Sequence, residues 1–374
     1  MKEIAFLTGT RADYGKIKSL LKILNLDPNY RVQILATGMH LLPKYGETIT
    51  QVTDDSLGVV HLLPNQMSDE QPMEISLART IERLSEFLDK NSPDLLVVHG
   101  DRIEALAGAI AGSIRNIPVA HIEGGEVSGT IDGLIRHSIS KLAHLHFVSN
   151  ESAKSRLLQL GEESNSIHII GSPDIDVMFS ENLPTIEEVK KRYDIGFQKY
   201  AIVTFHPITT ELSSLNEQVT NLTEALNLSD YNYVVIKPNN DRGSEVIQEK
   251  FELSLHSPRF KHLPSMRFEY FLTLMKESHF LIGNSSAGVR ESSYYGVPSI
   301  NIGTRQRNRQ SNQLIVDSPS LRSELLSAIS KVDSIERKPI FPFGNGNSAE
   351  LFKSIIDNEK IWPISTDKIF IDLQ

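Results

Sequence analysis

The chain has 374 residues, 40% of them hydrophobic and 23% charged, so it can bury a large core, and its length favours two domains. A net charge of -9 argues against general binding to nucleic acid or to an anionic membrane. The absence of cysteine excludes disulfides and thiolate chemistry and fits a reducing compartment. The apolar runs are too short for a signal peptide or a membrane span, so we expect a cytoplasmic protein.

Short apolar segments alternate with helical patterns through the first half of the chain. The segment at residues 94–99 is almost entirely apolar, which is typical of a strand buried on both faces of a parallel sheet. The predicted strands cover residues 4–7, 31–36, 59–63, 94–99, 117–122, 145–148 and 167–171. This alternation predicts a doubly wound α/β domain, which keeps its chemistry at the carboxyl ends of the strands.

The first predicted strand runs into G-T-R-A-D-Y-G-K, residues 9–16, and then into a helix. Unpaired N–H groups at a helix start favour an anion, and Arg11 and Lys16 would strengthen such a site. A capped turn with solvated basic residues explains the same pattern, and both interpretations stay open. The motif is not G-x-G-x-x-G, so it does not predict dinucleotide binding.

Three carboxylates follow two neighbouring predicted strands. Asp101 comes directly after residues 94–99, whereas Glu123 and Asp132 follow residues 117–122. Because like charges raise each other's pKa, converging acids are costly unless they bind a metal or do proton work. No H-E-x-x-H or similar spacing requires a metal, so we predict none.

Simpler explanations exist for some residues near these acids. Asp101 followed by Arg102 is also typical of a helix N-cap with an ion-pair neighbour. We expect His99 and His121, at two strand tips, to be structural. Supporting roles are expected for the remaining polar residues of this region, which are Glu126, Arg136 and His137.

The alternation stops at G-S-P-D, residues 171–174, and restarts near residue 200. The strands predicted beyond it cover residues 201–205, 233–236, 280–282 and 298–302. We therefore predict one Rossmann-like domain at residues 1–172 and a second at 173–356, with residues 357–374 packed on the first. The predicted fold is two doubly wound α/β domains that face each other across a cleft.

The stretch G-N-S-S-A-G, residues 283–288, is a second candidate phosphate site. Its glycines, among them Gly288, permit a tight turn, and the hydroxyls of Ser285 and Ser286 can bind oxygens beside helix N–H groups. Serine as a helix cap explains one of the two serines but not the whole pattern.

Other polar residues follow strands in the second half. His206 lies at a strand tip before a proline, which favours a functional role. Glu291, next to Arg290, binds ribose hydroxyls or forms a surface pair, and both alternatives stay open. Arg305 lies in an arginine-rich loop and is a candidate fork donor to a diphosphate.

The chain resembles the hydrolysing UDP-N-acetylglucosamine 2-epimerases, of the bacterial single-function type, in a series of motifs. In chain order these are G-T-R-A-D-Y-G-K, T-G-M-H, H-G-D-R-I-E-A-L, H-I-E-G-G-E-V-S-G-T-I-D, I-R-H-S-I-S-K, F-H-P, P-N-N-D, G-N-S-S-A-G-V-R-E and G-T-R-Q. The resemblance implies a glycosyltransferase-B-like fold. It also implies conversion of UDP-GlcNAc and water to ManNAc and UDP, the first step of sialic acid synthesis, without a cofactor.

What the resemblance implies for the mechanism is elimination of UDP to a 2-acetamidoglucal, followed by hydration. Asp101, Glu123 and Asp132 match the family's catalytic carboxylates, and we assign Glu123 to removal of the C2 proton and the other two to hydration. His206 is expected to protonate the leaving diphosphate. The residues assigned to substrate binding are Arg11, Lys16, Arg102, Asn239, Ser285, Ser286, Gly288, Glu291 and Arg305, with His206 also at a UDP-binding position. Lys237 departs from the tyrosine expected before P-N-N-D.

Several alternatives remain at this level. A sister enzyme would act on a UDP-2,4-diacetamido-2,4,6-trideoxyglucose in legionaminic acid synthesis, and a non-hydrolysing relative would return UDP-ManNAc. A glycosyltransferase or a UDP-sugar sensor would share the fold, although a sensor does not need three acids. We expect a UDP-sugar as the partner, no nucleic acid or membrane, and a homodimer or homotetramer.

Overall fold

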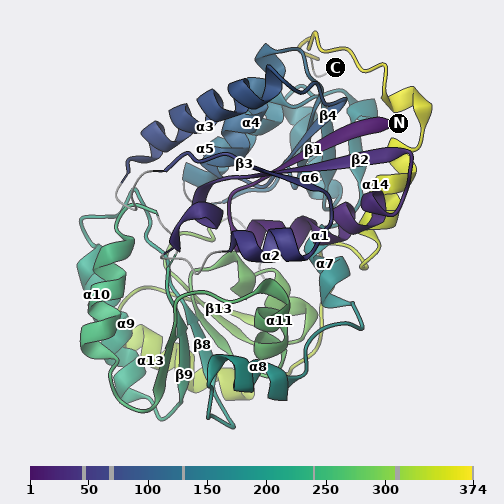
Figure 1. The fold of residues 1–374 in the computed structure, drawn as a ribbon. Coiled ribbons are helices and arrows are strands. Elements are labelled where there is room, and N and C mark those ends of the chain that lie inside the picture. Colours follow the sequence, from purple (N-terminus) through teal and green to yellow (C-terminus); the bar gives the residue numbers. More distant parts are fainter. Residues whose placement is uncertain (44–47, 67–70, 129–130, 239–240, 308–311, 373–374) are drawn as a thin grey trace. The chain divides into compact units, whose positions relative to one another are not determined.

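A computed structural model describes residues 1–43, 48–66, 71–128, 131–238, 241–307 and 312–372. The chain divides into two compact units (Figure 1). Unit 1 comprises Met1–Glu126, Asp132–Ser180 and Phe343–Gln374, and unit 2 comprises Val127–Ile131 and Glu181–Pro342. Each unit has its own parallel sheet with helices between the strands, which confirms the predicted α/β fold class. None of the helices in the described ranges has the length and apolar character needed to cross a membrane.

Unit 1 is built on a seven-stranded parallel sheet in the order β3-β2-β1-β4-β5-β6-β7. Its strands are β1 (Lys2–Thr8), β2 (Tyr30–Ala36), β3 (Val59–Leu62), β4 (Leu95–His99), β5 (Val119–Ile122), β6 (Leu145–Val148) and β7 (Ile167–Ile169). Its helices include α1 (Arg11–Asn25), α2 (Ile49–Asp54), α3 (Met73–Leu88), α4 (Ile103–Ile114), α5 (Ile131–Leu142), α6 (Glu151–Gln159), α7 (Pro173–Met178) and α14 (Ser348–Ile356). The central strand β4 is buried along its whole length, as expected for a strand covered on both faces.

Unit 2 is built on a six-stranded parallel sheet in the order β10-β9-β8-β11-β12-β13. Its strands are β8 (Ala201–Thr204), β9 (Tyr233–Ile236), β10 (Phe260–Leu263), β11 (Leu281–Gly283), β12 (Ser299–Ile302) and β13 (Ile315–Ser318). Its helices include α8 (Ile186–Tyr193), α9 (Leu215–Leu228), α10 (Ser244–Ser254), α11 (Phe268–Lys276), α12 (Glu291–Tyr294) and α13 (Arg322–Lys331). The edge strands β10 and β13 were not predicted, because they are only partly buried and have no continuous apolar run.

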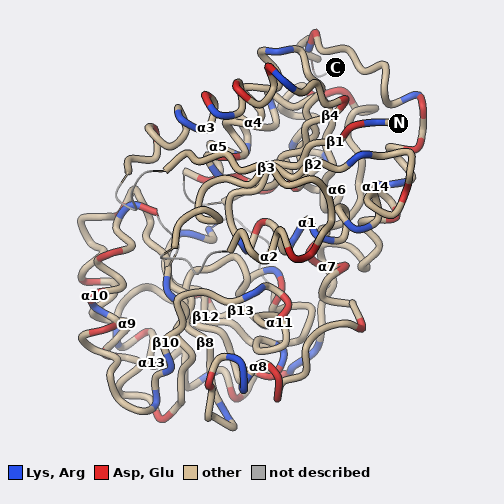
Figure 2. The backbone as a smooth tube through the Cα atoms, viewed as in Figure 1, with Lys and Arg blue, Asp and Glu red and all other residues tan. Residues whose placement is uncertain are grey.

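Helix α8 shows how local sequence defines an element of unit 2. The Thr185 side chain accepts from the backbone N–H of Glu188 and the Glu188 carboxylate accepts from the backbone N–H of Thr185, which is a capping box. Acidic residues occupy the first turn and basic residues the last turn, as the red and blue segments at α8 show (Figure 2). Both placements complement the helix dipole and stabilise a short helix.

The boundaries of the two units differ from the predicted ones, after residues 172 and 356. Helices α7 and α14 belong to unit 1, because both pack on α1. The Asp176 carboxylate of α7 accepts from the backbone N–H groups of Ser348 and Ala349 at the start of α14, both at 2.8 Å. The ring of Phe352 lies 4.6 Å from that of Phe147 in β6, centroid to centroid, so α14 completes the core of unit 1.

The C-terminal segment, yellow in Figure 1, is held to unit 1 by Lys368. Its ammonium group donates to the backbone carbonyls of Lys141 and Ala143 at the end of α5, at 2.9 and 2.5 Å, and to the buried carboxylate of Glu162 at 2.5 Å. A cation at this place satisfies carbonyls that the helix leaves unpaired. Burial alone would raise the pKa of Glu162, but hydrogen bonds from His146, Lys141 and Lys368 lower it to about 2.

We expect Lys368→Met to lower the free energy of unfolding of unit 1 by about 2 kcal/mol at pH 7, because charged hydrogen bonds to a buried carboxylate are lost. Since the folded pKa of Glu162 is depressed, this stabilisation is complete above about pH 4.5 and disappears as the pH falls towards 2. Urea unfolding followed by the fluorescence of Trp362, the single tryptophan, measures it. Lys360→Met is the control in the same segment. The prediction would be contradicted if Lys368→Met and Lys360→Met lowered the free energy of unfolding equally. It would also be contradicted if Lys368→Met lowered it as much at pH 2 as at pH 7.

Candidate active site

Three adjacent strands of unit 1, β1, β4 and β5, end at the same edge of the sheet because all are parallel. Helix α1, which follows β1, carries Asp13 in its first turn. Strand β4 ends in His99 and is followed by Asp101, and β5 is followed by Glu123. The structure therefore brings two of the predicted acids to neighbouring strand tips, where α/β folds bind ligands.

Arg136 of α5 connects these two tips. Its guanidinium donates to the Asp101 carboxylate and, at 2.5 Å, to the backbone carbonyl of Glu123. Asp132 lies on the same helix four residues earlier and so shares the face of Arg136. The predicted supporting role of Arg136 has a physical basis, since it orients one acid and the backbone of another.

Asp101 is not a helix N-cap. Helix α4 begins at Ile103 and its N-cap residue is Arg102, while the Asp101 carboxylate pairs with Arg136. The alternative of a cap with an ion-pair neighbour at Arg102 is therefore wrong. The Arg102 side chain instead contacts the buried carboxylate of Glu104, with Nε 3.3 Å from Oε2.

A chain of hydrogen bonds and ion pairs runs through His99. Its Nδ1 lies 2.9 Å from Oδ1 of Asp13, and its Nε2 lies 3.4 Å from Oε2 of Glu123. The other carboxylate oxygen of Glu123 accepts from the hydroxyl of Ser172, the N-cap residue of α7. Burial alone would lower the pKa of His99, but its bonds to the two carboxylates raise it to about 9.

Glu123 has a left-handed backbone conformation, with φ of 62°. Non-glycine residues adopt this conformation rarely and at a cost of about 1–2 kcal/mol. The backbone is held there by hydrogen bonds from its N–H to the carbonyl of Phe147, at 2.9 Å, and from Arg136 to its own carbonyl. Backbone strain of this kind is concentrated at functional positions.

His121 has the structural role predicted from its place at a strand tip. Its Nε2 lies 2.7 Å from the carbonyl of Gly100, and its Nδ1 lies 3.1 Å from the hydroxyl of Ser140. Burial lowers its pKa to about 3, so it is neutral at physiological pH. Glu126 likewise has a local partner, because its carboxylate accepts from Ser149 at 2.8 Å.

The basic residues after β1 are not simply solvated. Lys16 lies 3.1 Å from the fully buried carboxylate of Asp174, and its own side chain is 14% exposed. This ion pair connects α1 to α7. Arg11 is partly buried at the start of α1. At this candidate anion site, Lys16 is therefore held by an ion pair and is not a solvated side chain.

In unit 2, Asn284 connects the predicted residues His206 and Arg305. The Asn284 side chain accepts from the backbone N–H of His206 at 2.7 Å and donates to its carbonyl at 2.8 Å. The backbone carbonyl of Asn284 accepts from Arg305 at 3.3 Å and from Gln306 at 2.8 Å. The side chain and the backbone carbonyl of one buried asparagine therefore connect the turns after β8, β11 and β12.

The turn after β11 differs in part from the predicted phosphate loop. Ser286–Gly288 form a 3-10 turn, and the α-helix that follows, α12, has only four residues, so its dipole is small. Ser285 accepts from the backbone N–H of Ala287 at 3.4 Å. Ser285 and Ser286 are both partly exposed, so their hydroxyls, more than a helix dipole, are the groups able to bind an anion here.

Glu291 and Arg290 are both buried, with exposed fractions of 2% each. The alternative of a solvated surface pair is therefore wrong. Asn239 lies outside the described residues. Lys237 pairs with Glu252, with Nζ 2.8 Å from Oε1, in an exposed position.

Sequence reasoning missed the partners that organise the predicted residues: Asp13, Ser172, Asn284 and Gln306. Asp13 lies in the turn motif after β1 and Asn284 in G-N-S-S-A-G, so both were in motifs already singled out. An acidic residue in the first turn of a helix is usually explained by the helix dipole, which concealed its bond to His99.

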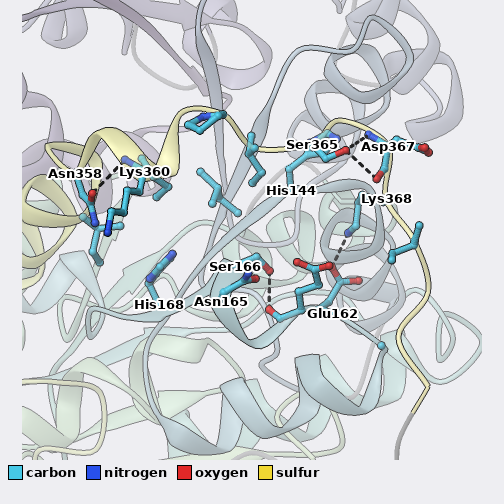
Figure 3. A pocket seen from close by; sticks show the side chains of 18 of the residues that line it. His144, Glu162, Asn165, Ser166, His168, Asn358, Lys360, Ser365, Asp367 and Lys368 are labelled. Atoms are coloured by element: carbon cyan, nitrogen blue, oxygen red, sulfur yellow. Dashed lines mark hydrogen bonds and ion pairs between the residues drawn. The ribbon is translucent and has the colours of Figure 1, made fainter.

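A cavity of about 630 Å³ lies under the C-terminal segment of unit 1 (Figure 3). His144, Glu162, His168 and Lys368 are among the residues that line it. Its described lining contains none of the predicted site residues, so it is separate from the candidate active site. Among the described residues, no group of three or more His, Asp or Glu side chains is arranged to hold a metal ion.

Parallel α/β units with ionisable side chains at their strand ends place the molecule among the α/β proteins that bind ligands at this edge of the sheet. Comparison with known proteins makes this specific. A family model described as UDP-N-acetylglucosamine 2-epimerase matches residues 22–357. The chain belongs to the UDP-N-acetylglucosamine 2-epimerase family and is an enzyme of that family.

Similar proteins include the UDP-N-acetylglucosamine 2-epimerase of Neisseria meningitidis serogroup B, which is 45% identical over 100% of both chains. The polysialic acid biosynthesis protein P7 of Escherichia coli is 35% identical over 88% of this chain and 85% of its own. The hydrolysing UDP-N,N'-diacetylbacillosamine 2-epimerase of Legionella pneumophila is 32% identical over 85% of each chain. Among solved structures, the Methanocaldococcus jannaschii UDP-GlcNAc 2-epimerase with UDP-GlcNAc and UDP has a TM-score of 0.82 at 21% identity, covering 96% and 99% of the two chains. This likeness shows a shared fold.

Proposed function

We propose that the enzyme is of the hydrolysing type and converts UDP-GlcNAc and water to ManNAc and UDP at the start of sialic acid synthesis. The observation that carries this proposal is the group of ionisable side chains at the strand tips of unit 1, with Glu123 bonded to His99 and Asp101 to Arg136. Relatives whose names refer to hydrolysis and to polysialic acid biosynthesis support it.

Glu123 is proposed to remove the C2 proton. That proton is weakly acidic, so its removal is coupled to departure of the diphosphate through a transition state with oxocarbenium character. The backbone of Glu123 is fixed by its hydrogen bonds with Phe147 and Arg136. Its carboxylate is oriented by Ser172 and His99. A base that is fixed in this way needs little reorganisation during the reaction.

Asp101 and Asp132 are proposed to act in hydration of the 2-acetamidoglucal. The addition of water needs a base to activate the water at C1 and an acid to deliver a proton to C2. Asp101 is partly exposed and ordered by Arg136, and Asp132 lies on the same helix face as Arg136. Arg136 thus pairs with Asp101 and lies one helical turn from Asp132.

The UDP group is proposed to be bound by Arg11, His206, Ser285, Ser286, Glu291 and Arg305, with Lys16, Arg102, Asn239 and Gly288 as further substrate-binding residues. Guanidinium and hydroxyl groups stabilise the charge that develops on the leaving diphosphate. His206 is proposed to protonate it. The ordering of His206 and Arg305 by Asn284 supports a common ligand for these two side chains.

Incubation with UDP-GlcNAc in deuterated water tests the proposed function. We expect free UDP without any acceptor, and ManNAc with deuterium at C2, detected by mass spectrometry and proton NMR. Recovery of UDP-ManNAc would show a non-hydrolysing enzyme, and the absence of C2 exchange would overturn the elimination mechanism. A parallel reaction with UDP-2,4-diacetamido-2,4,6-trideoxyglucose decides the C4 specificity, since a faster reaction there would assign the enzyme to the sister activity.

A further inference from the structure

The chain Asp13–His99–Glu123 crosses three elements of unit 1, namely the first turn of α1, the end of β4 and the residue after β5. Both ring nitrogens of His99 face carboxylate oxygens, at 2.9 and 3.4 Å. A neutral imidazole donates from one nitrogen only, whereas an imidazolium donates from both. Nδ1 of His99 forms the hydrogen bond to Asp13, whereas Nε2 forms no hydrogen bond with the described residues but lies within ion-pair distance of Glu123. A place between two carboxylates favours a protonated His99.

Asp13 is fixed as a carboxylate by its own surroundings. One oxygen accepts from the hydroxyl of Thr8 at 2.8 Å and from the backbone N–H of Gly9 at 3.0 Å, and the other faces His99. Asp13 also lies in the first turn of α1, where the positive end of the helix dipole stabilises a carboxylate. Burial would raise the pKa of Asp13, but the hydrogen bond to His99 and these further bonds lower it.

The other ionisable groups around Asp13, His99 and Glu123 do not compete for the proton. His121 and His40 are buried, and burial lowers the pKa of His121 to about 3 and that of His40 to about 4. Arg136 and Arg11 remain charged at any working pH, and their charges contribute to the lowered pKa of His121 and of His40, respectively. His99 is therefore the group at the centre of this cluster whose charge can change, with a pKa of about 9.

We propose that His99 is a positioning residue for the epimerase reaction, which as an imidazolium anchored by Asp13 keeps Glu123 ionised and aimed as the C2 base. Ser172 donates to one oxygen of the Glu123 carboxylate, and the other oxygen lies 3.4 Å from Nε2 of His99, so the two groups act on different oxygens. An opposite charge within about 4–6 Å lowers the pKa of a carboxyl group by about 1–3 units and so favours its ionised form. This inference rests on the proposed role of Glu123 as the base.

The test is the pH dependence of kcat. His99→Gln retains a donor but loses the positive charge, so we expect the acid limb to move to higher pH by about 1–3 units. Asp13→Asn removes the anchor, so we expect the alkaline limb, where His99 loses its proton near pH 9 in the unmodified enzyme, to move to lower pH by a similar amount. KM for UDP-GlcNAc should stay within about twofold in both variants, because neither residue is assigned to UDP binding.

Two measurements separate this inference from other outcomes. His168→Gln, on β7 of the same unit, should leave both limbs in place. Nitrogen-15 NMR of histidine-labelled enzyme, with His99 assigned by its loss in His99→Gln, should show a doubly protonated ring at pH 8 without reference to activity. A neutral ring at pH 8, or a uniform loss of kcat without any shift of a limb, would overturn the inference.

The variant Glu123→Gln distinguishes failure of the inference from failure of the proposed function. If Glu123→Gln still exchanges deuterium into C2, the base is misassigned and the inference falls with it. If Glu123→Gln is inactive in exchange but His99→Gln and Asp13→Asn keep the unmodified pH profile, only the role of His99 fails. If His99→Gln does not fold, the pH profile of Asp13→Asn still decides the matter.

Discussion

Asp101→Asn is expected to lower kcat about 10³-fold, the usual size of a general acid–base contribution, while the Kd for UDP stays within about twofold. The asparagine side chain keeps an oxygen that can accept from Arg136, so the packing of the strand tip is retained. What it loses is the ability to exchange a proton. Steady-state kinetics with UDP-GlcNAc and calorimetric titration with UDP measure the two quantities.

Asp94→Asn is the matched control, because Asp94 precedes the same strand, β4, at its opposite end. There it accepts from Lys2 and from the backbone N–H of Glu3, both at 2.8 Å. We expect kcat to change less than about twofold, since surface ion pairs contribute little. If Asp101→Asn weakens UDP binding as much as it lowers kcat, Asp101 acts in binding and not in the reaction.

Gly283→Ala is expected to lower the free energy of unfolding of unit 2 by about 4 kcal/mol or more. Gly283 has φ of +146°, and a Cβ there would lie 2.0 Å from the backbone carbonyl oxygen of Thr204 in the paired strand β8. Neither strand can move without breaking the ladder between β8 and β11. Urea unfolding measured by circular dichroism should lose the transition of unit 2, while the fluorescence of Trp362 reports on unit 1 alone.

Gly303→Ala separates the two causes of this effect. Gly303 also has a positive φ, of +74°, but the nearest atom to an added Cβ is the Ser320 hydroxyl oxygen at 3.6 Å. In Gly303→Ala only the left-handed backbone conformation is unfavourable, so we expect the free energy of unfolding to fall by about 1 kcal/mol. Losses of equal size in Gly283→Ala and Gly303→Ala would mean that close approach of the backbone to Thr204 is not the cause.

The sequence alone predicted the features that depend on short stretches of chain. Apolar runs located the central strands of both sheets, and the polar residues directly after them placed Asp101 and Glu123 at strand tips. These predictions succeed because a buried parallel strand and its turn are encoded locally.

What the sequence did not predict depends on contacts between distant residues. His99 and Asp13 are 86 positions apart, and Arg136 and Asp101 are 35 apart, so neither pairing leaves a local signal. The edge strands β10 and β13 are half-buried and lack an apolar run. Helix α14 has an ordinary amphipathic pattern, which does not indicate which sheet it covers.

The division of the chain has a consequence for the order of folding during synthesis. Except for Val127–Ile131, unit 2 is one continuous stretch, Glu181–Pro342, whereas unit 1 needs both ends of the chain. The core of unit 1 includes Phe352 and Ile356 of α14, which are synthesised after the whole of Glu181–Pro342. Although domains usually fold in the order of their synthesis, here the second unit has its whole core available before the first does. The part of the first sheet that α14 covers therefore stays uncovered until α14 has been synthesised, after the core of unit 2.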